Sequence, residues 1–407
     1  MLNLPRRWRR AMLFALLAVM QSGVVHAEGA PSAKPLVIGF IYDKTGPLEA
    51  YMKQTHAGFM MGLDVATGGT LRVAGRPIVV VEKDSHGKPD IGKAQLESAY
   101  ADDKADLAIV AASSGVTLST LPIAEEYKRI LIVEPAVADS ITGAKWNRYV
   151  FRTARSSTQD AVSNAMVLDK PGTTLATLAQ DNAFGRDGIR AFKQALKTAQ
   201  VAHEEYLPPA TSDFTAGAQR IIARLKNAPG RKVLFIIWAG GNPFKIADQN
   251  LARHGIEIAT GGNILAAMAA YKAFPGMEGA TNYYYELPKN AMNDELVKRH
   301  FAQFKTPPDF FTAGGMAAAS AVVTALKATN GDSKGDRLVA AMRGMAFDTP
   351  KGRMIFRAED HQALQSMYHF RIKVDPNVAW AIPELVRELT PEMLAIPIQN
   401  TKAPGRR

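Results

Sequence analysis

Short apolar runs alternate with helix-patterned segments from Leu36 almost to the end of this 407-residue chain. A short continuous apolar run bounded by polar turns is typical of a strand that is covered on both faces, as in a parallel sheet. Successive parallel strands need a crossover connection between them, which is usually a helix. The alternation therefore predicts an α/β protein built on doubly wound parallel sheets.

The candidate strands fall into two series. The first covers residues 36–41, 78–82, 107–111 and 130–133, and the second covers 174–179, 233–238, 256–259 and 280–285. The segments between them carry apolar residues at helical spacing. Two series predict two lobes, and the stretch Phe151-Arg152-Thr153 is the first candidate crossover between them.

The later segments complicate a simple tandem of lobes. Helices are expected over 312–328 and 333–343, before a last strand over 368–373. We expect the chain to return to the first lobe near Glu286 and to the second near Met367. The first lobe is then 35–153 with 287–367, the second is 154–286 with 368–385, and 386–407 is an irregular tail. Several crossings form a hinge that lets two lobes close around a ligand.

The first 27 residues have the pattern of an export signal. Four arginines precede a short apolar core over residues 11–20, and Val25-His26-Ala27 offers a cleavage point; the arginines are Arg6, Arg7, Arg9 and Arg10. We expect cleavage after Ala27, by general secretion rather than the twin-arginine route that Arg6-Arg7 also permits. The apolar core is shorter than the roughly 20 residues that span a bilayer. We expect no membrane span in the mature chain, because no later stretch looks long and uncharged enough.

Composition restricts the partners of the mature chain. There is no cysteine, which excludes disulfides, thiolate metal sites and a lipid anchor at the cleavage site. The apolar content of 47% suffices for real cores, and the formal charge of +11 includes the four leader arginines. The remaining Lys and Arg are scattered and not interleaved with aromatics, so nucleic-acid binding is not expected.

The common catalytic signatures are missing from the sequence. It contains no G-x-S-x-G elbow, no H-E-x-x-H helix, no phosphate-binding loop and no dinucleotide fingerprint. Asp84-Ser85-His86 offers a nucleophile beside a base, but neighbours on one loop do not point at one reacting atom without special geometry, so a polar turn is the better interpretation. His361 and His369 lack metal-ligand spacing. No catalytic residue, metal or cofactor is predicted.

A series of short motifs carries a family resemblance. In order they are Ile38-Gly39-Phe40, Thr45-Gly46-Pro47, Ser113-Ser114, Glu134-Pro135-Ala136, Phe151-Arg152-Thr153, residues 181–188, residues 212–215 and residues 347–352. With this order and spacing, the chain from Pro35 to about Lys373 resembles type I periplasmic binding proteins, and within them the branched-chain amino-acid (Leu/Ile/Val) receptors of ABC importers. The resemblance implies two hinged lobes with a ligand between them.

The resemblance also implies which residues bind the ligand. In the first lobe a hydroxyl and backbone N–H groups at helix starts hold a carboxylate, a role that fits Ser113 and Ser114, because unsatisfied N–H groups and the helix dipole favour an anion. A serine at such a position, taken alone, is more often a helix N-cap than a ligand contact, and the resemblance reverses that preference for Ser114. Ala136 and Ala138 would offer backbone groups, and Tyr51 matches an aromatic residue that lines the ligand.

In the second lobe, Phe184 and the segment from Trp238 to Asn242 follow predicted strands and should face the cleft. An aromatic wall suits a mostly apolar solute. Ordinary core burial is the alternative interpretation for Trp238.

Two positions depart from the pattern of the amino-acid receptors. Ala138 stands where they commonly have a hydroxyl residue, and Gly261-Gly262-Asn263 stands where they have an acid that meets the ligand ammonium. A buried ammonium without a carboxylate is costly. We therefore expect the ligand to be a small carboxylate with an apolar or aromatic body and no obligatory ammonium, and a branched-chain or other amino acid stays open as an alternative. We expect Asn263 to contact this ligand.

The resemblance implies a monomeric solute-binding protein of the periplasm that delivers its ligand to the transmembrane subunits of an ABC permease and catalyses nothing. Two alternatives stay open at this point. One is a periplasmic hydrolase or isomerase on an α/β scaffold, which turnover would reveal. The other is a sensory receptor for the same solute.

Overall fold

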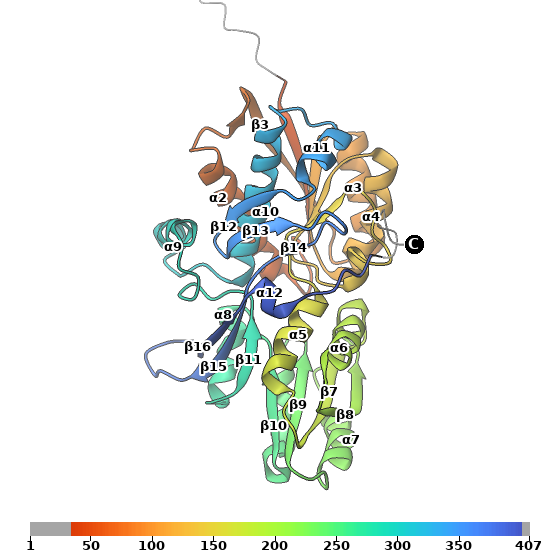
Figure 1. Cartoon of the computed structure of the whole chain (residues 1–407), viewed down its shortest axis with the longest axis vertical. Coiled ribbons are helices and arrows are strands. Elements are labelled where there is room, and N and C mark those ends of the chain that lie inside the picture. The colour runs from red at the N-terminus through yellow and green to blue at the C-terminus, as the bar shows by residue number, and fades with distance from the viewer. Residues whose placement is uncertain (1–33, 401–407) are drawn as a thin grey trace, which may run out of the picture. The chain divides into compact units, whose positions relative to one another are not determined.

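The computed structural model describes residues 34–400. The export signal and its cleavage point therefore lie outside the described residues, as do positions 401–407. The helices and strands follow the expected alternation, and Figure 1 shows them gathered around two main sheets, one in each lobe. The fold is that of two doubly wound α/β lobes, as predicted from the sequence.

The first lobe has a six-stranded sheet in the order β2-β3-β1-β4-β5-β6. Neighbouring strands are parallel except for the hairpin of β2 and β3. Figure 1 shows α2 on one side of this sheet and α3 and α4 on the other, which explains why β4 and β5 are buried along their whole length. The elements are β1 (Leu36–Tyr42), α2 (Glu49–Ala66), β2 (Arg72–Val73), β3 (Arg76–Asp84), α3 (Pro89–Ala101), β4 (Leu107–Ala111), α4 (Ser114–Tyr127), β5 (Leu131–Val133), the 3-10 turn η1 (Asp139–Ile141) and β6 (Val150–Arg152).

The second lobe has a four-stranded parallel sheet in the order β10-β9-β7-β8. Its elements are α5 (Ser157–Leu168), β7 (Thr173–Gln180), α6 (Ala183–Ala195), β8 (Gln200–Leu207), α7 (Thr215–Leu225), β9 (Arg231–Ile237), η2 (Pro243–Gln249), η3 (Leu251–His254) and β10 (Ile256–Thr260). Two apolar clusters lie against this sheet, and they contain the central residues of β7 and β9.

The chain after β10 packs on both lobes in turn. Residues of α10, α11 and the hairpin sheet β12-β13-β14 join the apolar core of the first sheet, whereas Phe370 and Ile372 of β15 join a core of the second. The elements are α8 (Leu265–Met268), η4 (Ala270–Ala273), β11 (Glu278–Thr281), α9 (Ala291–Phe304), α10 (Phe310–Ala328), α11 (Gly335–Met342), β12 (Ala346–Thr349), β13 (Gly352–Phe356), β14 (Ala363–Leu364), β15 (Met367–Lys373), β16 (Ile382–Leu389) and α12 (Pro391–Leu394).

Several elements differ from the sequence prediction. The strand expected over 280–285 is β11, which ends at Thr281, because Tyr283 turns into a separate apolar cluster with α9 and α10. Strands β8 and β16 were not predicted. β16 ends at Leu389 and so runs past position 386, where the irregular tail was expected to begin. It pairs with β15 in an antiparallel sheet of its own with β11.

The statement that no later stretch is long and uncharged enough to span a membrane was wrong for α10. This helix meets the criterion by length and composition, yet 89% of its apolar window is buried inside the protein. It packs so closely on α2 that a Cβ added at Gly58 would lie 1.9 Å from the carbonyl oxygen of Thr312. Its surroundings are those of the core helix of a lobe.

The predicted crossover at residues 151–153 is held by a buried arginine. The Arg152 guanidinium donates to Gln362 Oε1, to the carbonyl oxygen of Ala138 at 2.7 Å and to Thr142 Oγ1 at 2.7 Å. A second crossing segment is tied to the first through Gln365, whose Nε2 donates to the carbonyl oxygen of Thr153 at 3.3 Å. These bonds fasten neighbouring crossings to one another.

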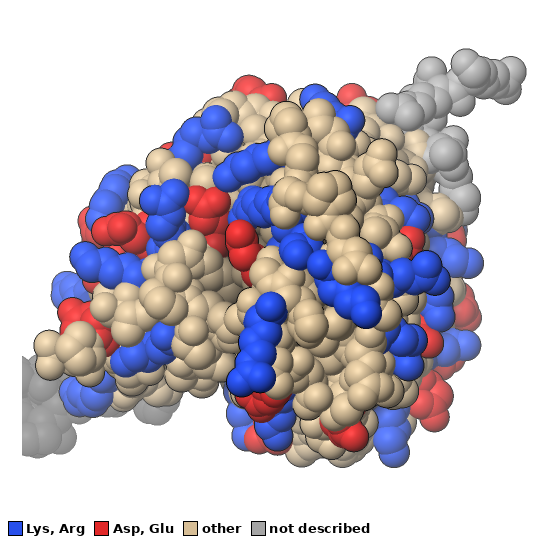
Figure 2. All heavy atoms as spheres, turned by 90° about the horizontal axis from the view of Figure 1, so that it is seen from below, with Lys and Arg blue, Asp and Glu red and all other residues tan. Residues whose placement is uncertain are grey.

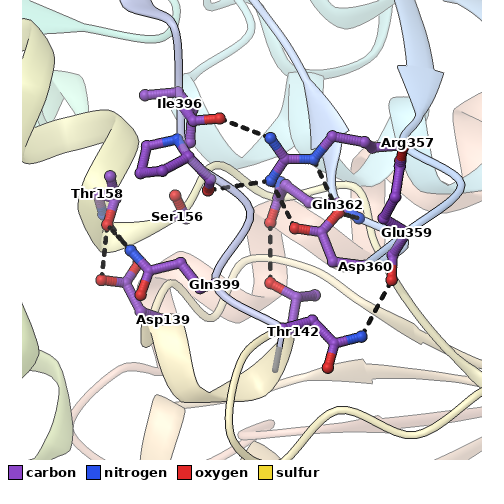
Figure 3. Close-up of polar contacts among 12 residues, drawn as sticks. Asp139, Thr142, Ser156, Thr158, Arg357, Glu359, Asp360, Gln362, Ile396 and Gln399 are labelled. Carbon is purple, nitrogen blue, oxygen red and sulfur yellow. Dashed lines mark hydrogen bonds and ion pairs between the residues drawn. The ribbon is translucent and has the colours of Figure 1, made fainter. Parts of the chain in front are cut away.

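The C-terminal tail is fastened beside the same crossover (Figure 3). Arg357 Nη1 donates to the carbonyl oxygen of Ile396 at 2.6 Å, and Gln399 Nε2 donates to Thr158 Oγ1, near the start of α5, at 2.7 Å. Asn400 is fully buried and donates to the carbonyl oxygen of Glu359 at 3.0 Å. The segment after α12 is thus irregular in backbone, as expected, but firmly attached.

Candidate ligand-binding site

The loops that face the cleft follow the carboxyl ends of the parallel strands. In doubly wound sheets ligands bind where the strand order reverses, which here is between β1 and β4 and between β7 and β9. The loops after these strands, with those after β5 and β10, line a cavity that is partly open to solvent and has about 850 Å³ of empty space when its open mouth is included. We call it the interlobe chamber. Figure 2 shows the surface from below, with Lys and Arg interspersed among Asp and Glu.

The start of α4 supplies donors for an anion. Ser113 is the N-cap, and its Oγ accepts from Val116 N at 3.3 Å, so the cap is Ser113 and not Ser114. Ser114 Oγ accepts from Ala138 N at 3.2 Å, which leaves its own O–H to donate. The N–H groups of Ser114, Gly115 and Ala136 have no hydrogen-bond partner within the described part of the chain. All three residues line the interlobe chamber.

A buried carboxylate fixes the loop before α4. Asp43 accepts from Ser113 N at 3.3 Å and from Ser85 Oγ at 2.5 Å. Burial raises the pKa of Asp43 above its ordinary value. Because Ser85 donates to Asp43 while His86 Nδ1 contacts Thr45 Oγ1 at 2.7 Å, the Asp84-Ser85-His86 run does not form a nucleophile and base pair.

Aromatic side chains form the first-lobe wall of the chamber. Tyr51 of α2 packs on Phe311 of α10 with ring centroids 4.7 Å apart, and Phe310 lies edge-on to Phe311 at 4.8 Å. The Tyr51 oxygen accepts from Gly240 N, in the loop after β9, at 2.9 Å. Burial raises the pKa of Tyr51, so the phenol stays protonated. Tyr51 therefore lines the ligand space and also bridges the lobes.

The second-lobe wall contains Phe184 and Trp238, which both line the interlobe chamber as expected. Phe184 lies in the first turn of α6, and Trp238 follows β9 and packs edge-on against Phe214 at 5.5 Å. Phe184 and Ser114 thus face one shared cavity. Asn263, after β10, also lines it, while its Oδ1 accepts from Ile264 N at 2.8 Å.

Two of the expected site residues do not line the cavity. Ala138 is fully buried behind it, with its N–H bound to Ser114 and its carbonyl oxygen bound to Arg152. Asn242 is exposed at the start of η2, where its Oδ1 accepts from Phe244 N at 3.1 Å. Gly241 adopts φ +59°, and the chain turns away from the cleft before Asn242.

Three residues at the candidate site were not predicted from the sequence. Arg155, Phe310 and Phe311 all line the interlobe chamber. The two phenylalanines begin α10, which the chain brings to the cleft only after its return to the first lobe. Arg155 lies two residues beyond the predicted crossover, and a lone charge at that place was a usable signal.

A second cavity of about 610 Å³ adjoins the first. We call it the second-lobe chamber, because α5, β9, β10 and β11 supply most of its lining. Both chambers share Arg155, Phe184, Trp238, Gly262, Asn263 and Phe310. The two chambers therefore lie side by side.

Comparison with known proteins identifies relatives along most of the chain. The family model described as "Periplasmic binding protein" matches residues 35–377. A Leu/Ile/Val-binding protein homologue from Brucella abortus is 23% identical over 62% of this chain, and the match covers 66% of that relative, just under two thirds of its length.

Two solved structures from Rhodopseudomonas palustris have the same fold. An ABC-type branched-chain amino acid transporter protein is 61% identical, with a TM-score of 0.80 over 90% of this chain and 100% of that one. A solute-binding protein of an ABC transporter, solved with 3,4-dihydroxybenzoic acid, is 25% identical, with a TM-score of 0.77 over 92% of this chain and 99% of that one.

Proposed function

The chain belongs to the periplasmic binding protein family, and from that premise we propose that its interlobe chamber captures a small aromatic carboxylate for an ABC permease. The family consists of solute-binding transport receptors of the periplasm and is not an enzyme family. The observation that carries the proposal is a group of unused donors at the start of α4 facing aromatic side chains from both lobes.

The donors at α4 suit a carboxylate. Ser114 and Gly115 of α4 and Ala136 of the loop after β5 line the chamber, and the Ser114 hydroxyl and the N–H groups of Gly115 and Ala136 have no acceptor among the described residues. The positive end of the helix dipole adds to the attraction of the α4 donors for an anion. Hydrogen bonds to a charged group are worth about 1.5–3 kcal/mol each when well formed. The ligand's carboxylate therefore has a defined place.

The walls suit a flat apolar body. Tyr51 and Phe311 on one side and Phe184 and Trp238 on the other bound the space between the lobes. Aromatic pairs contribute about 0.5–1.5 kcal/mol beyond the area that they bury. The dihydroxybenzoate complex of the 25% identical relative supports an aromatic acid for this chain too.

The linings give no support to a ligand ammonium. Of the described residues that line the two chambers, one is acidic, namely Asp160, and it is paired with Arg155 at 2.7 Å. An α-amino acid would bury its ammonium without a carboxylate of its own. We therefore favour acids without an amino group over leucine and its relatives.

A thermal-shift screen followed by titration calorimetry tests this function. Purified protein should bind benzoate or a ring-substituted benzoate, and its Tm should rise because the ligand binds the native state alone. Tight binding of leucine with no response to any aromatic acid would refute the proposal. Chromatography of the released ligand should return it unchanged, since we propose that the protein catalyses nothing.

The remaining proposals concern processing, partners and domain limits. We propose cleavage after Ala27, a monomeric mature protein and docking to the permease transmembrane subunits. We also propose lobes at 35–153 with 287–367 and at 154–286 with 368–385. Mass spectrometry of the exported protein checks the cleavage point, and light scattering checks the monomer.

A further inference from the structure

Most polar groups in the second-lobe chamber are already engaged within the protein. Thr260 Oγ1 donates to the carbonyl oxygen of Ile236 at 2.9 Å, and the Tyr271 hydroxyl donates to that of Gly261 at 2.9 Å. Asn164 uses both ends of its amide, since it donates to the carbonyl oxygen of Asp160 and accepts from Ala280 N. These side chains shape the chamber but have few groups left for a ligand.

Arg155 is different, because it has donors to spare. Its Nε donates to Asp160 Oδ1 at 2.7 Å, and its Cζ lies 4.7 Å from the ring centroid of Phe310. Neither Nη1 nor Nη2 has a hydrogen-bond partner among the described residues. The side chain is only 13% exposed and lines both chambers. Both Nη groups keep some exposure, so an acceptor that arrives with the ligand can reach them and gains affinity from a hydrogen bond to a charged donor.

The local charge decides which acceptor fits. Asp160 already balances the charge of Arg155. A second ligand carboxylate would therefore leave a net negative charge in a shielded site, whereas a hydroxyl or carbonyl oxygen accepts from Arg155 without adding charge. The chamber also lies beyond the shared residues Phe184 and Asn263, away from the α4 donors of the interlobe chamber.

We propose that Arg155 forms a second polar subsite, which selects aromatic acids bearing a neutral oxygen at the end remote from the carboxylate. This inference rests on the proposed function, because the carboxylate must be held at the start of α4 for the far end of the ring to reach Arg155.

Calorimetric titration with matched pairs of acids tests the subsite. One pair is benzoate with 4-hydroxybenzoate, and a longer pair is 3-phenylpropanoate with 3-(4-hydroxyphenyl)propanoate. In at least one pair the hydroxylated acid should bind about tenfold tighter, as expected for one hydrogen bond to a charged group. Terephthalate, which carries a second carboxylate, should bind more weakly than 4-hydroxybenzoate.

Variants then assign the preference to Arg155. Arg155→Met should collapse the affinity ratio within the preferred pair. The matched control is Arg186→Met, because Arg186 also contacts an aspartate and an aromatic ring, Asp181 and Tyr206, but lines neither chamber. If Arg155→Met fails to fold, the double variant Arg155→Met with Asp160→Asn is used in its place, because the second substitution removes the carboxylate that the first leaves unpaired.

Three results would overturn the inference. Equal affinity within both pairs would show that no such subsite exists. Equal losses for both members of a pair in Arg155→Met would show that Arg155 holds the carboxylate instead. Tightest binding of terephthalate would contradict the charge argument. In each case aromatic acids still bind, so the proposed function stands; a wild-type protein that binds leucine and no aromatic acid refutes both.

Discussion

The phenol oxygen of Tyr51, on α2 of the first lobe, accepts a hydrogen bond from the backbone N–H of Gly240, in the loop after β9 of the second. The donor and acceptor are 2.9 Å apart and close one side of the interlobe chamber. An ion pair of 3.4 Å also joins Asp139, in η1 of the first lobe, to Arg190, in α6 of the second. The described conformation is therefore one in which the lobes touch.

Tyr51→Phe should weaken ligand binding by shifting the lobes toward an open form. The lost hydrogen bond is worth about 0.5–1.5 kcal/mol, which corresponds to a rise in Kd of roughly twofold to thirteenfold. Small-angle scattering without ligand should show a larger radius of gyration. Tyr149→Phe is the control, because it loses a hydrogen bond to Asp336 away from the chamber. An unchanged Kd in Tyr51→Phe would contradict the closing role.

Ser114→Ala should weaken carboxylate binding about tenfold or more, because it removes a donor at the start of α4 and frees Ala138 N from its acceptor. Calorimetry with benzoate measures the loss. Ser119→Ala on the same helix is the control, since Ser119 Oγ donates to backbone carbonyl oxygens of Pro89 and Val116 outside the chamber. Identical affinities for the Ser114→Ala variant and wild type would place the carboxylate elsewhere.

His361 should make the protein less stable in mild acid. Its ring lies flat on Phe151 with centroids 4.0 Å apart, and burial lowers its pKa to about 4. The folded protein keeps this imidazole neutral, while an unfolded histidine binds a proton below about pH 6.5. The free energy of unfolding should therefore fall by about 3 kcal/mol as the pH drops from about 6.5 toward 4, because protons bind the unfolded histidine and not the buried one.

Urea unfolding at several pH values measures this loss. His361→Asn should flatten the dependence between pH 6.5 and 4, and asparagine tolerates the positive φ of 61° at this position. His254→Asn, in η3 of the second lobe, should retain the wild-type profile. A profile for His361→Asn as steep as the wild type would assign the acid sensitivity to other groups.

Arg357→Met should loosen the C-terminal tail. Arg357 contacts the carbonyl oxygens of Ile396 and Pro397 and pairs with Asp360, which is only 2% exposed. Leaving that carboxylate unpaired should lower the free energy of unfolding by about 3 kcal/mol. Limited proteolysis should also clip the tail sooner. Arg353→Met, on β13, alters a side chain that is 69% exposed and should change stability by less than about 0.5 kcal/mol.

The sequence was informative where one segment decides its own structure. The runs that form β1, β4, β7 and β10 are recognisable as strands from their apolar residues. The loops after such strands meet at a sheet edge, and Ser114, Phe184 and Trp238 line the chamber there, while their contact with a ligand stays a prediction. The strand β8 was missed because, as an edge strand beside β7, it carries polar residues such as Glu204 and Glu205.

The rest of the site depends on distant parts of the chain. Phe310 and Phe311 reach the chamber only because α10 packs on α2. The two helices are far apart in the sequence, so the local pattern around either one does not reveal that contact. Asn242 was misplaced because a glycine turn, which periodicity does not register, ends the cleft-facing segment before it. The Ser114 hydroxyl and the aromatic residues after predicted strands were thus predictable, while the two phenylalanines of the returning helix were not, and Arg155 was overlooked although its charge was a signal.

The attachment of the tail matters for anyone who labels this protein. An affinity tag or dye joined just past Asn400 would pull on the backbone next to the first residues of α5, where the proposed pivot of the two lobes lies. Since the sequence has no native thiol, Lys298→Cys on α9, where the lysine side chain is 80% exposed, gives a single attachment point remote from that pivot. Biosensors built from this scaffold should carry their reporter there.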